Sequence, residues 1–470
     1  MTQIDILPDD ALLEIFDFHR NIHPPNRRTK ADVEAWISLV HVCRRWRTLV
    51  LGSPRRLNLR LFCTPETTTK DRLDVFPTVP LIVAGDVTLL DTDNIVAALG
   101  QSNRVCDVSL MGLADRQLDK VLATMQVPFP ELTELSLCSF EDTSSVIPDS
   151  FLGGSAPRLL HFELDGISFP NLPNLLLSTN HLVSLSLTDN SLSGRISPET
   201  IIALLSVLTS LKTLLLEFHF LRPLLGWESR SSPLPKRSIL PALDQFYFEG
   251  VTEYLEDLVT FMDAPQLKTS NISFTNQIDV SCPRLGRFIN CTSTLSAPNK
   301  ARVQFDDHSA IFKLQYPTSK SSHYHLLIEI PRRESDLLLS SIGQVCNSFL
   351  HTISTVEDLY IERQYFPVDW ENDAIGNTLW FQLLLPFTAV KNLYLSKEFA
   401  PCIAAALRAL VGGSITRLFP SLQNIFVEGL ESSRLFQDNI EQFVAARHLS
   451  GHPFAVSVWD EDSSMNPTSQ

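Results

Sequence analysis

The feature that most constrains the fold of this chain is a six-residue pattern that returns beyond residue 100. In each copy the first, fourth and sixth residues are apolar, and a turn that contains proline usually precedes the copy. Within the first five copies and within the last three, the starting residues lie 23 to 34 residues apart. A short unit repeated at such a period cannot bury its apolar face alone, so the copies should stack on one another. Examples of these copies are Leu132–Leu137, Leu159–Leu164, Leu182–Leu187, Leu211–Leu216, Leu243–Phe248, Val356–Ile361, Val390–Leu395 and Leu422–Val427.

The segments between these copies have the apolar spacing of helices, for example 200–208, 340–349 and 400–411. Each unit is therefore predicted to be a strand, a turn and a helix, which is the signature of a leucine-rich repeat. We predict an α/β fold in which an irregular leucine-rich-repeat solenoid, with a parallel sheet and outer helices, follows a small all-α domain. The stretch Ala301–Ile330 departs from this pattern, because its apolar residues alternate in short runs that predict extra strands or a hairpin insertion.

These patterns predict a division of the chain into four parts. Residues 1–60 form the helical domain, and residues 61–100 form a connecting segment. Residues 101–460 form the irregular repeat domain, and residues 461–470 form a disordered tail.

Two amphipathic helices are predicted near the N-terminus. Pro8 and the acidic residues after it favour a helix over residues 8–19, with Leu12, Ile15, Phe16 and His19 on one side. A second helix is expected near Ala31–Leu51, because apolar residues recur there at spacings of three and four. Two such helices bury too little surface to be stable alone, so a partner chain or the downstream domain should cover their apolar faces.

Two segments of this region, Leu7–Phe16 and Val42–Arg47, resemble the two halves of an F-box. Three further segments, Ser53–Leu61, Pro386–Leu395 and Phe443–Pro453, are similar to the expanded F-box proteins of mushroom-forming fungi. The resemblance implies that the helices bind a Skp-type adaptor and, through it, a cullin. It places in or just behind the adaptor interface Leu7, Pro8, Leu12, Ile15, Val42, Cys43 and Trp46.

The function that this resemblance implies is that of the substrate-recognition subunit of an SCF-type E3 ubiquitin ligase. The F-box would bind the adaptor, and the repeat domain would bind a protein substrate whose identity stays open. The alternative is an adaptor-independent protein-binding scaffold. In that case Leu12, Ile15 and Trp46 would pack against the repeat domain and shield the end of its core.

The substrate is expected on the open face of the sheet, where the third and fifth residues of each copy point. The fifth residue is small or polar in the early copies and mostly aromatic in the later ones. Exposed aromatic residues are enriched where proteins anchor partners. Alternatively, the C-terminal tail or the 301–330 stretch covers these rings and makes them core. The predicted substrate-binding residues are Gln245, Tyr247, Asp358, Tyr360, Asn392, Tyr394, Asn424 and Phe426.

The net charge and the cysteines limit which partners and which cellular compartment are compatible with this sequence. A net charge of -15 opposes binding to nucleic acid or to an anionic membrane surface. The longest apolar runs fall far short of the roughly 20 residues that cross a bilayer, and the first residues do not resemble a secretory signal. The eight cysteines are scattered without a C-x-x-C pair, as expected of free thiols in a reducing compartment. We therefore expect a cytoplasmic or nuclear protein.

Signals of catalysis or metal binding are weak. The sequence lacks the common phosphate-binding, zinc-protease and nucleophile-elbow motifs. His323 and His325, with His308 upstream, have no cysteine or acidic third ligand nearby. The acidic pairs Asp306-Asp307 and Asp460-Glu-Asp462 are adjacent in sequence and suit a solvated surface. We expect a non-catalytic subunit that has no cofactor and no metal.

Overall fold

The structure is a computed structural model. It describes residues 6–21, 30–88, 92–140, 145–169, 172–189, 196–218, 237–275, 280–306, 309–317, 324–331, 335–363, 374–409, 418–429 and 434–459. The chain divides into two compact units, which we call unit 1 (Met1–Ile196) and unit 2 (Ser197–Gln470). Within the described residues, no helix is both long enough and apolar enough to cross a membrane.

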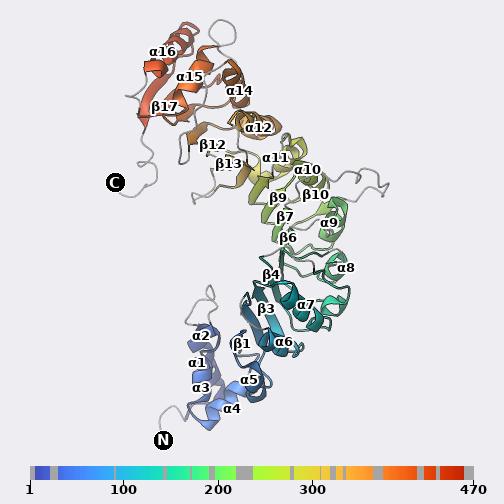
Figure 1. The fold of residues 1–470 in the computed structure, drawn as a ribbon. Helices are drawn as coiled ribbons and strands as arrows, with labels where there is room; N and C mark the ends of the chain where they lie inside the picture. Colours follow the sequence, from blue (N-terminus) through green and yellow to red (C-terminus); the bar gives the residue numbers. More distant parts are fainter. Residues whose placement is uncertain are drawn as a thin grey trace. The chain divides into compact units, whose positions relative to one another are not determined.

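Unit 1 begins with short helices and continues as strands that alternate with helices (Figure 1). Its strands lie in the order β1-β2-β3-β4-β5-β6, and each pairs with the next in parallel. The elements are α1 (Asp9–Asn21), α2 (Lys30–Val33), α3 (Ile37–Val40), α4 (Arg44–Gly52), β1 (Leu61–Cys63), α5 (Thr69–Val75), β2 (Leu81–Asp86), α6 (Asp93–Leu99), β3 (Val105–Met111), α7 (Asp115–Thr124), β4 (Glu134–Cys138), a 3₁₀ turn (Phe151–Gly154), β5 (His161–Asp165), α8 (Leu172–Leu176) and β6 (Ser184–Asp189).

Unit 2 continues the alternation of strands and helices and holds an antiparallel segment. Its strands lie in the order β7-β9-β11-β14-β13-β12-β15-β16-β17-β18, and β8 pairs with β10 separately. The elements are α9 (Pro198–Leu205), β7 (Thr213–Phe218), β8 (Ser238–Ile239), β9 (Gln245–Gly250), α10 (Thr252–Thr260), β10 (Met262–Asp263), β11 (Thr269–Phe274), α11 (Pro283–Cys291), a 3₁₀ turn (Ser293–Leu295), β12 (Lys300–Phe305), β13 (Ser309–Gln315), β14 (Leu326–Pro331), α12 (Ser335–Ser348), α13 (Leu350–Ile353), β15 (Asp358–Arg363), α14 (Ala374–Leu384), β16 (Asn392–Leu395), α15 (Ala400–Arg408), β17 (Asn424–Glu428), α16 (Arg434–Leu449) and β18 (Ala455–Trp459).

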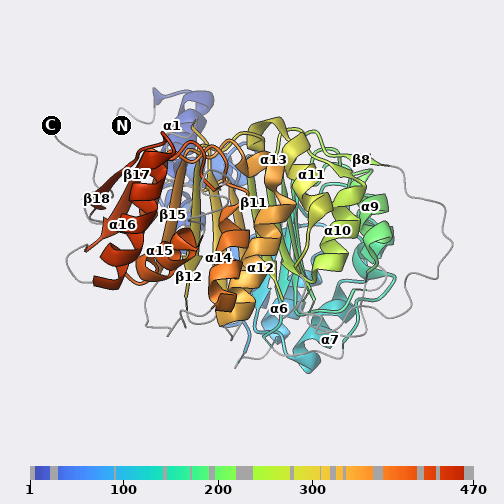
Figure 2. The same ribbon diagram turned by 90° about the horizontal axis from the view of Figure 1, so that it is seen from above.

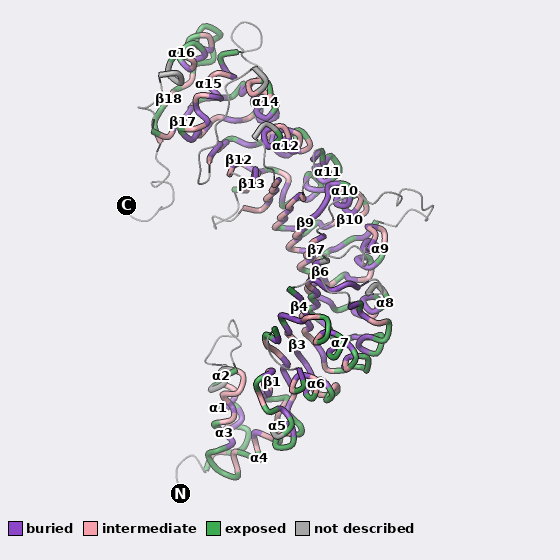
Figure 3. Tube along the Cα trace, in the orientation of Figure 1, coloured by how far each residue is buried: buried purple, intermediate pink, exposed green. Residues whose placement is uncertain are grey.

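The apolar positions of the six-residue pattern form the core of each unit. In β4, Leu135 and Leu137 are buried while the residues between them are half-buried, and β16 repeats this alternation. In unit 2 the helices lie along one side of the strands (Figure 2). Many of the buried residues belong to the strands (Figure 3). The alternation of parallel strands and helices in an α/β fold is confirmed. The opposite face of each sheet carries the third and fifth residues of each copy.

The stretch 301–330 forms strands, as its alternation predicts, and these strands are part of the main sheet of unit 2. The strands β12 and β13 pair antiparallel, and so do β13 and β14. The outer two continue the sheet in parallel, β14 with β11 and β12 with β15. This meander therefore lies between the early and the late copies of the six-residue pattern in unit 2.

Two boundaries differ from those predicted. The single helix expected near Ala31–Leu51 is three short helices, α2, α3 and α4. The break before α4 lies at Cys43, which has an extended backbone (φ -156°, ψ 170°) and caps α4 with its side chain. The alternation of strands and helices begins at Leu61, within the segment that we expected to be a connection. The predicted tail 461–470 lies outside the described residues.

Candidate functional site

The N-terminal helices pack on one another through a small apolar core. Leu12 and Phe16, on the buried side of α1, are 0% and 1% exposed. The ring of Phe16 lies 4.7 Å from that of Trp46 in α4, centroid to centroid. Arg45 in α4 contacts Asp9 in α1 at 2.6 Å, and Arg56, in the segment after α4, contacts Asp10 in α1 at 2.9 Å. The apolar side of α1 is thus partly covered by α4.

The middle of this region is anchored on the first strand of unit 1. Trp36 is 1% exposed, and its indole Nε1 donates to the carbonyl oxygen of Arg60 at 2.8 Å. Its ring meets that of Phe76 edge-on, at 5.4 Å. The carboxylate of Glu34 accepts the backbone N–H of Phe62 in β1 and pairs with Arg72 in α5 at 2.7 Å. These contacts attach the helices to the strands that follow them.

Several apolar side chains on these helices and on the residues next to them remain in solvent. Ile6, Ile15, Phe18 and Val42 are 76%, 45%, 74% and 59% exposed, and we call these four the exposed apolar set. Water-exposed apolar side chains that recur on one small element are typical of a surface that another protein covers. The packing inside unit 1 therefore leaves part of the apolar surface of these helices uncovered.

The predicted adaptor-binding residues fall into three groups. Pro8, Ile15, Val42 and Cys43 are exposed, Leu7 and Trp46 are half-buried, and Leu12 lies in the core behind them. Reasoning from the sequence missed two members of the exposed apolar set, Ile6 and Phe18. The signal was available for Phe18, because it follows Ile15 by three residues and so lies close to it on the helix surface.

Unit 2 carries a row of stacked aromatic rings on its open face. Tyr360, Tyr394 and Phe426 occupy matching register positions of the neighbouring strands β15, β16 and β17. The rings of Tyr360 and Tyr394 are 4.2 Å apart and 6° from parallel, and those of Tyr394 and Phe426 are 4.7 Å apart and 11° from parallel. We call these three residues the aromatic row. Burial, followed by the neighbouring hydroxyl of Tyr394, raises the pKa of Tyr360, so the phenol is neutral at physiological pH.

A row of polar side chains, which we call the amide ladder, lies two residues earlier on each strand and consists of Asp358, Asn392 and Asn424. The side-chain Nδ2 of Asn424 donates to Oδ1 of Asn392 at 2.8 Å, and Nδ2 of Asn392 donates to Oδ1 of Asp358 at 2.8 Å. Each amide is fixed by its neighbours, so its remaining hydrogen-bonding groups have defined directions. Such a ladder beside stacked rings presents apolar area and polar groups together, as protein-binding surfaces do.

The last strand partly covers the aromatic row. The indole ring of Trp459 in β18 meets Tyr360 and Tyr394 edge-on, at 6.2 Å and 5.6 Å. The guanidinium of Arg302 in β12 lies 5.0 Å from the ring centre of Tyr360 on the other flank. All three rings of the row are nevertheless half-buried rather than core. Of the two alternatives expected from the sequence, the C-terminal tail 461–470 lies outside the described residues, and the 301–330 stretch contributes the contact of Arg302 with Tyr360.

Gln245 and Tyr247, which the sequence groups with the aromatic row, lie elsewhere on the sheet. Their strand β9 is separated from β15 by β11, β14, β13 and β12. The register neighbours of Tyr247 are Leu215 and Asn271, and neither is aromatic. The other six predicted substrate-binding residues lie together on β15, β16 and β17. Gln245 and Tyr247 are separated from them because the meander lies between two copies that follow each other in the sequence.

The structure describes only some of the residues that carry the weak metal and acidic signals of the sequence. Among the described parts of the chain, no group of three or more metal-binding side chains is found. Asp306 accepts hydrogen bonds from the backbone and hydroxyl of Ser309 in the turn between β12 and β13. His308, His323, Asp307 and residues 460–462 lie outside the described residues.

Comparisons with known proteins add little to this geometry. No family model and no curated protein matches the chain. Among solved structures, the leucine-rich repeat-containing protein LegL7 from Legionella pneumophila is similar at 12% identity and a TM-score of 0.29. The match covers 77% of this chain and 97% of that one.

Proposed function

We propose that this chain is the substrate-recognition subunit of an SCF-type ubiquitin ligase, with its strand–helix units forming an irregular leucine-rich-repeat platform. The observation that carries the proposal is the exposed apolar set. Isolated exposed apolar side chains are common on soluble proteins, but here two lie one turn apart on α1 and a third, Val42, immediately precedes the cap of α4. Of these residues, Ile15 and Val42 belong to the two segments that resemble the halves of an F-box, and Phe18 follows the first segment by two residues.

In this proposal the chain recruits proteins and performs no chemistry itself. The N-terminal helices bind a Skp-type adaptor and, through it, a cullin, with Leu7, Pro8 and Cys43 beside the exposed apolar set. A protein substrate binds the open face of unit 2, at the aromatic row and the amide ladder. The transfer of ubiquitin is then the work of the conjugating enzyme that the ligase recruits.

A binding assay with the purified adaptor tests the first half of the proposal. Replacing Ile15 and Phe18 together by serine should weaken adaptor binding by at least about tenfold, since buried anchors at interfaces commonly contribute more than 1 kcal/mol each. The matched control replaces Leu449, an 88% exposed side chain in unit 2, by serine. Exposed positions tolerate such changes within about 0.5 kcal/mol of stability, so the melting temperatures of both variants should stay near that of the wild type.

The second candidate is an adaptor-independent protein-binding scaffold. The observation that favours it is the anchoring of Trp36 and Glu34 on β1 and α5, which makes the N-terminal helices an integral cap of the first strands. Terminal caps of this kind are required to shield the core of a repeat array. A wild-type chain that folds but shows no adaptor binding would favour the scaffold and reject the ligase subunit.

A further inference from the structure

A pocket of about 690 Å³ opens at the start of the strands in unit 1. Its walls come from residues 52–60 after α4, from residues 78–80 before β2, and from the residues that precede β3, β4 and β5. The polar residues Thr78, Asn103 and Thr133 belong to its lining. A pocket of this size holds a small charged group together with part of the molecule that carries it.

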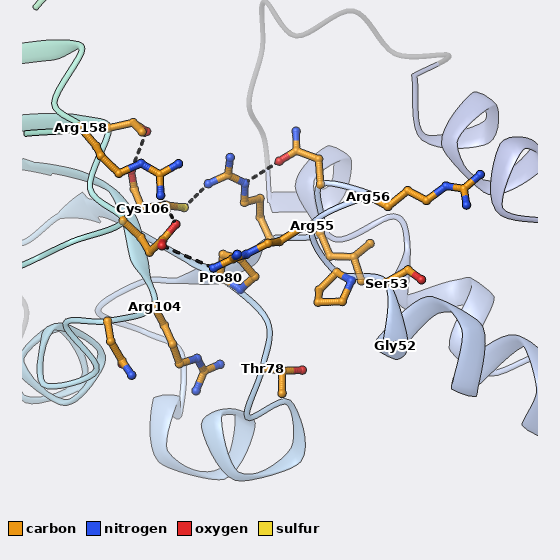
Figure 4. Close-up of a pocket in the computed structure, with 16 residues that line it drawn as sticks. Gly52, Ser53, Arg55, Arg56, Thr78, Pro80, Arg104, Cys106 and Arg158 are labelled. Atoms are coloured by element: carbon orange, nitrogen blue, oxygen red, sulfur yellow. Dashed lines mark hydrogen bonds and ion pairs between the residues drawn. The ribbon is translucent and has the colours of Figure 1, made fainter. Parts of the chain in front are cut away.

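The lining of this pocket is strongly basic in a chain whose net charge is -15. Its arginines are Arg55, Arg56, Arg60, Arg104 and Arg158, and Glu131 is the only acidic residue among the described residues of the lining. Arg56 extends away toward the N-terminal helices (Figure 4), where Asp10 and Glu14 neutralise it. The other four arginines of the lining share a single carboxylate, that of Glu131, which pairs with Arg55 and Arg158. Positive charge is therefore in excess in the lining of the pocket.

Two of these arginines share Glu131 from opposite sides. Arg158 contacts the carboxylate at 2.7 Å and Arg55 contacts it at 3.4 Å, as the dashed lines of Figure 4 indicate. Arg55 and Arg158 are 85% and 57% exposed, so an incoming ligand can reach both guanidinium groups. One carboxylate cannot neutralise two guanidinium groups, and this pair keeps a net positive charge.

The other two arginines are held by neutral groups. Arg60 donates to Oδ1 of Asn58 and to the sulfur of Cys106. Arg104 donates to the carbonyl oxygens of Phe76 and Val79. These contacts fix the directions of the guanidinium groups without cancelling their charge. Burial lowers the pKa of Arg104, which shows that its surroundings disfavour an uncompensated cation.

We propose that this pocket binds a phosphate monoester. Guanidinium groups recognise phosphate through paired hydrogen bonds, and the tetrahedral dianion accepts such bonds from several directions at once. The chemistry is the same whether the ester is a free small molecule or a phosphorylated side chain of a protein. The site lies apart from the exposed apolar set and does not depend on adaptor binding.

Calorimetric titration of the full chain tests the proposal with three probes. Glycerol 3-phosphate represents a free ester, N-acetyl-O-phosphoserine amide represents a phosphorylated side chain, and citrate is a carboxylate trianion. Both esters should bind, citrate should bind at least about tenfold more weakly, and the tighter ester identifies the natural source. Citrate binding as tight as that of the esters, or no heat from either ester at about 10 mM, overturns the proposal.

Two substitutions in the pocket should change the affinity for the esters in opposite directions, which distinguishes a loss of binding from damage to the fold. Arg60→Gln removes a fixed cation and should weaken ester binding about tenfold. Glu131→Gln removes the competing carboxylate, frees Arg55 and Arg158, and should tighten binding about threefold. Arg408→Gln in unit 2, where the side chain donates to Asn439, is the matched control and should change nothing. If both pocket variants weaken binding equally, or neither alters it, the assigned site is wrong.

Discussion

The rings of Tyr360 and Tyr394 lie face to face on neighbouring parallel strands, 4.2 Å apart and within 6° of parallel. Equal register positions on adjacent parallel strands bring side chains into contact, so two tyrosines on neighbouring strands touch although they are more than thirty residues apart in the chain. Phe426 extends the same stack on β17. The result is a rigid aromatic surface that loses little conformational freedom when a partner covers it.

The aromatic row should therefore be required for binding of the protein substrate. Replacing Tyr360 and Tyr394 together by alanine should abolish co-purification of bound protein from the native cells. It should lower the free energy of unfolding by only about 1–3 kcal/mol, because the rings are half-buried and their stacking contributes about 0.5–1.5 kcal/mol per pair. Quantitative mass spectrometry of captured proteins and a denaturant melt measure the two effects.

Tyr247→Ala provides the matched control for that double variant. Tyr247 occupies the same position of its six-residue copy, but its register neighbours are Leu215 and Asn271. It should leave the captured proteins unchanged. Loss of the same proteins from the Tyr247 variant would mean that binding extends across the meander, and an unchanged set from the double variant would reject the aromatic row as the substrate site.

Much of the fold can be predicted from local sequence patterns, and each feature that was missed has an identifiable physical reason. The positions of Leu135, Leu359 and Leu393 predict buried strand residues directly, because the six-residue pattern encodes which side chains enter the core. Strand β11 escaped detection because Ser270 stands where the pattern has an apolar residue. The separation of Tyr247 from Tyr360 depends on long-range strand pairing, which no local period records.

The contact between Trp459 and the aromatic row was also beyond reach of the sequence. The strand β18 lacks the six-residue pattern, and its pairing with β17 is what brings the indole to Tyr360 and Tyr394. Conversely, Leu12 and Ile15 lie on the same side of α1, yet Leu12 is buried and Ile15 is exposed. Sequence alone could place both on an apolar side, but it could not tell how far α4 covers it.

Thiol labelling should distinguish two accessible cysteines from the buried ones. Cys43 and Cys291 are exposed, whereas burial raises the pKa of Cys63 to about 11 and keeps its thiol protonated at pH 8. A chromogenic disulfide reagent should therefore modify two thiols rapidly in the native chain, and Cys43→Ser should remove one of them.

Cys43 also provides a footprint for the adaptor. It caps α4 next to Val42 and belongs to the predicted adaptor-binding residues. A saturating amount of adaptor should slow the labelling of Cys43 and leave that of Cys291 in unit 2 unchanged. Equal rates for Cys43 with and without a bound adaptor would show that the adaptor covers another surface.

The ion pair of Glu34 with Arg72 should stabilise unit 1 far more than its exposed ion pairs do. The side chains of Glu34 and Arg72 are 9% and 22% exposed, and Glu34 also accepts the backbone N–H of Phe62. Glu34→Gln should lower the free energy of unfolding by about 2 kcal/mol, because it weakens two charge-assisted hydrogen bonds in a partly buried site.

An exposed pair in the same unit provides the comparison. Lys120 and Asp93 are 54% and 78% exposed and lie 3.3 Å apart. Lys120→Gln should cost no more than about 0.5 kcal/mol, since solvent screens such pairs. Denaturant melts that give the two variants equal losses would contradict the role assigned to Glu34.

Two glycines inside helices of unit 2 should respond oppositely to the same substitution. A methyl group on Gly286 in α11 would lie 2.1 Å from the backbone oxygen of Ser348 in α12, a contact that requires the two helices to separate. Gly343 in α12 has no neighbour closer than 3.8 Å at the equivalent position. In an unobstructed helix, alanine is about 1 kcal/mol more favourable than glycine.

Gly343→Ala should therefore raise the free energy of unfolding by up to about 1 kcal/mol, while Gly286→Ala should lower it by about 1–3 kcal/mol through overpacking. Chemical denaturation of both variants measures the difference, and a stabilised Gly286 variant would mean that α11 and α12 are not in the close contact described.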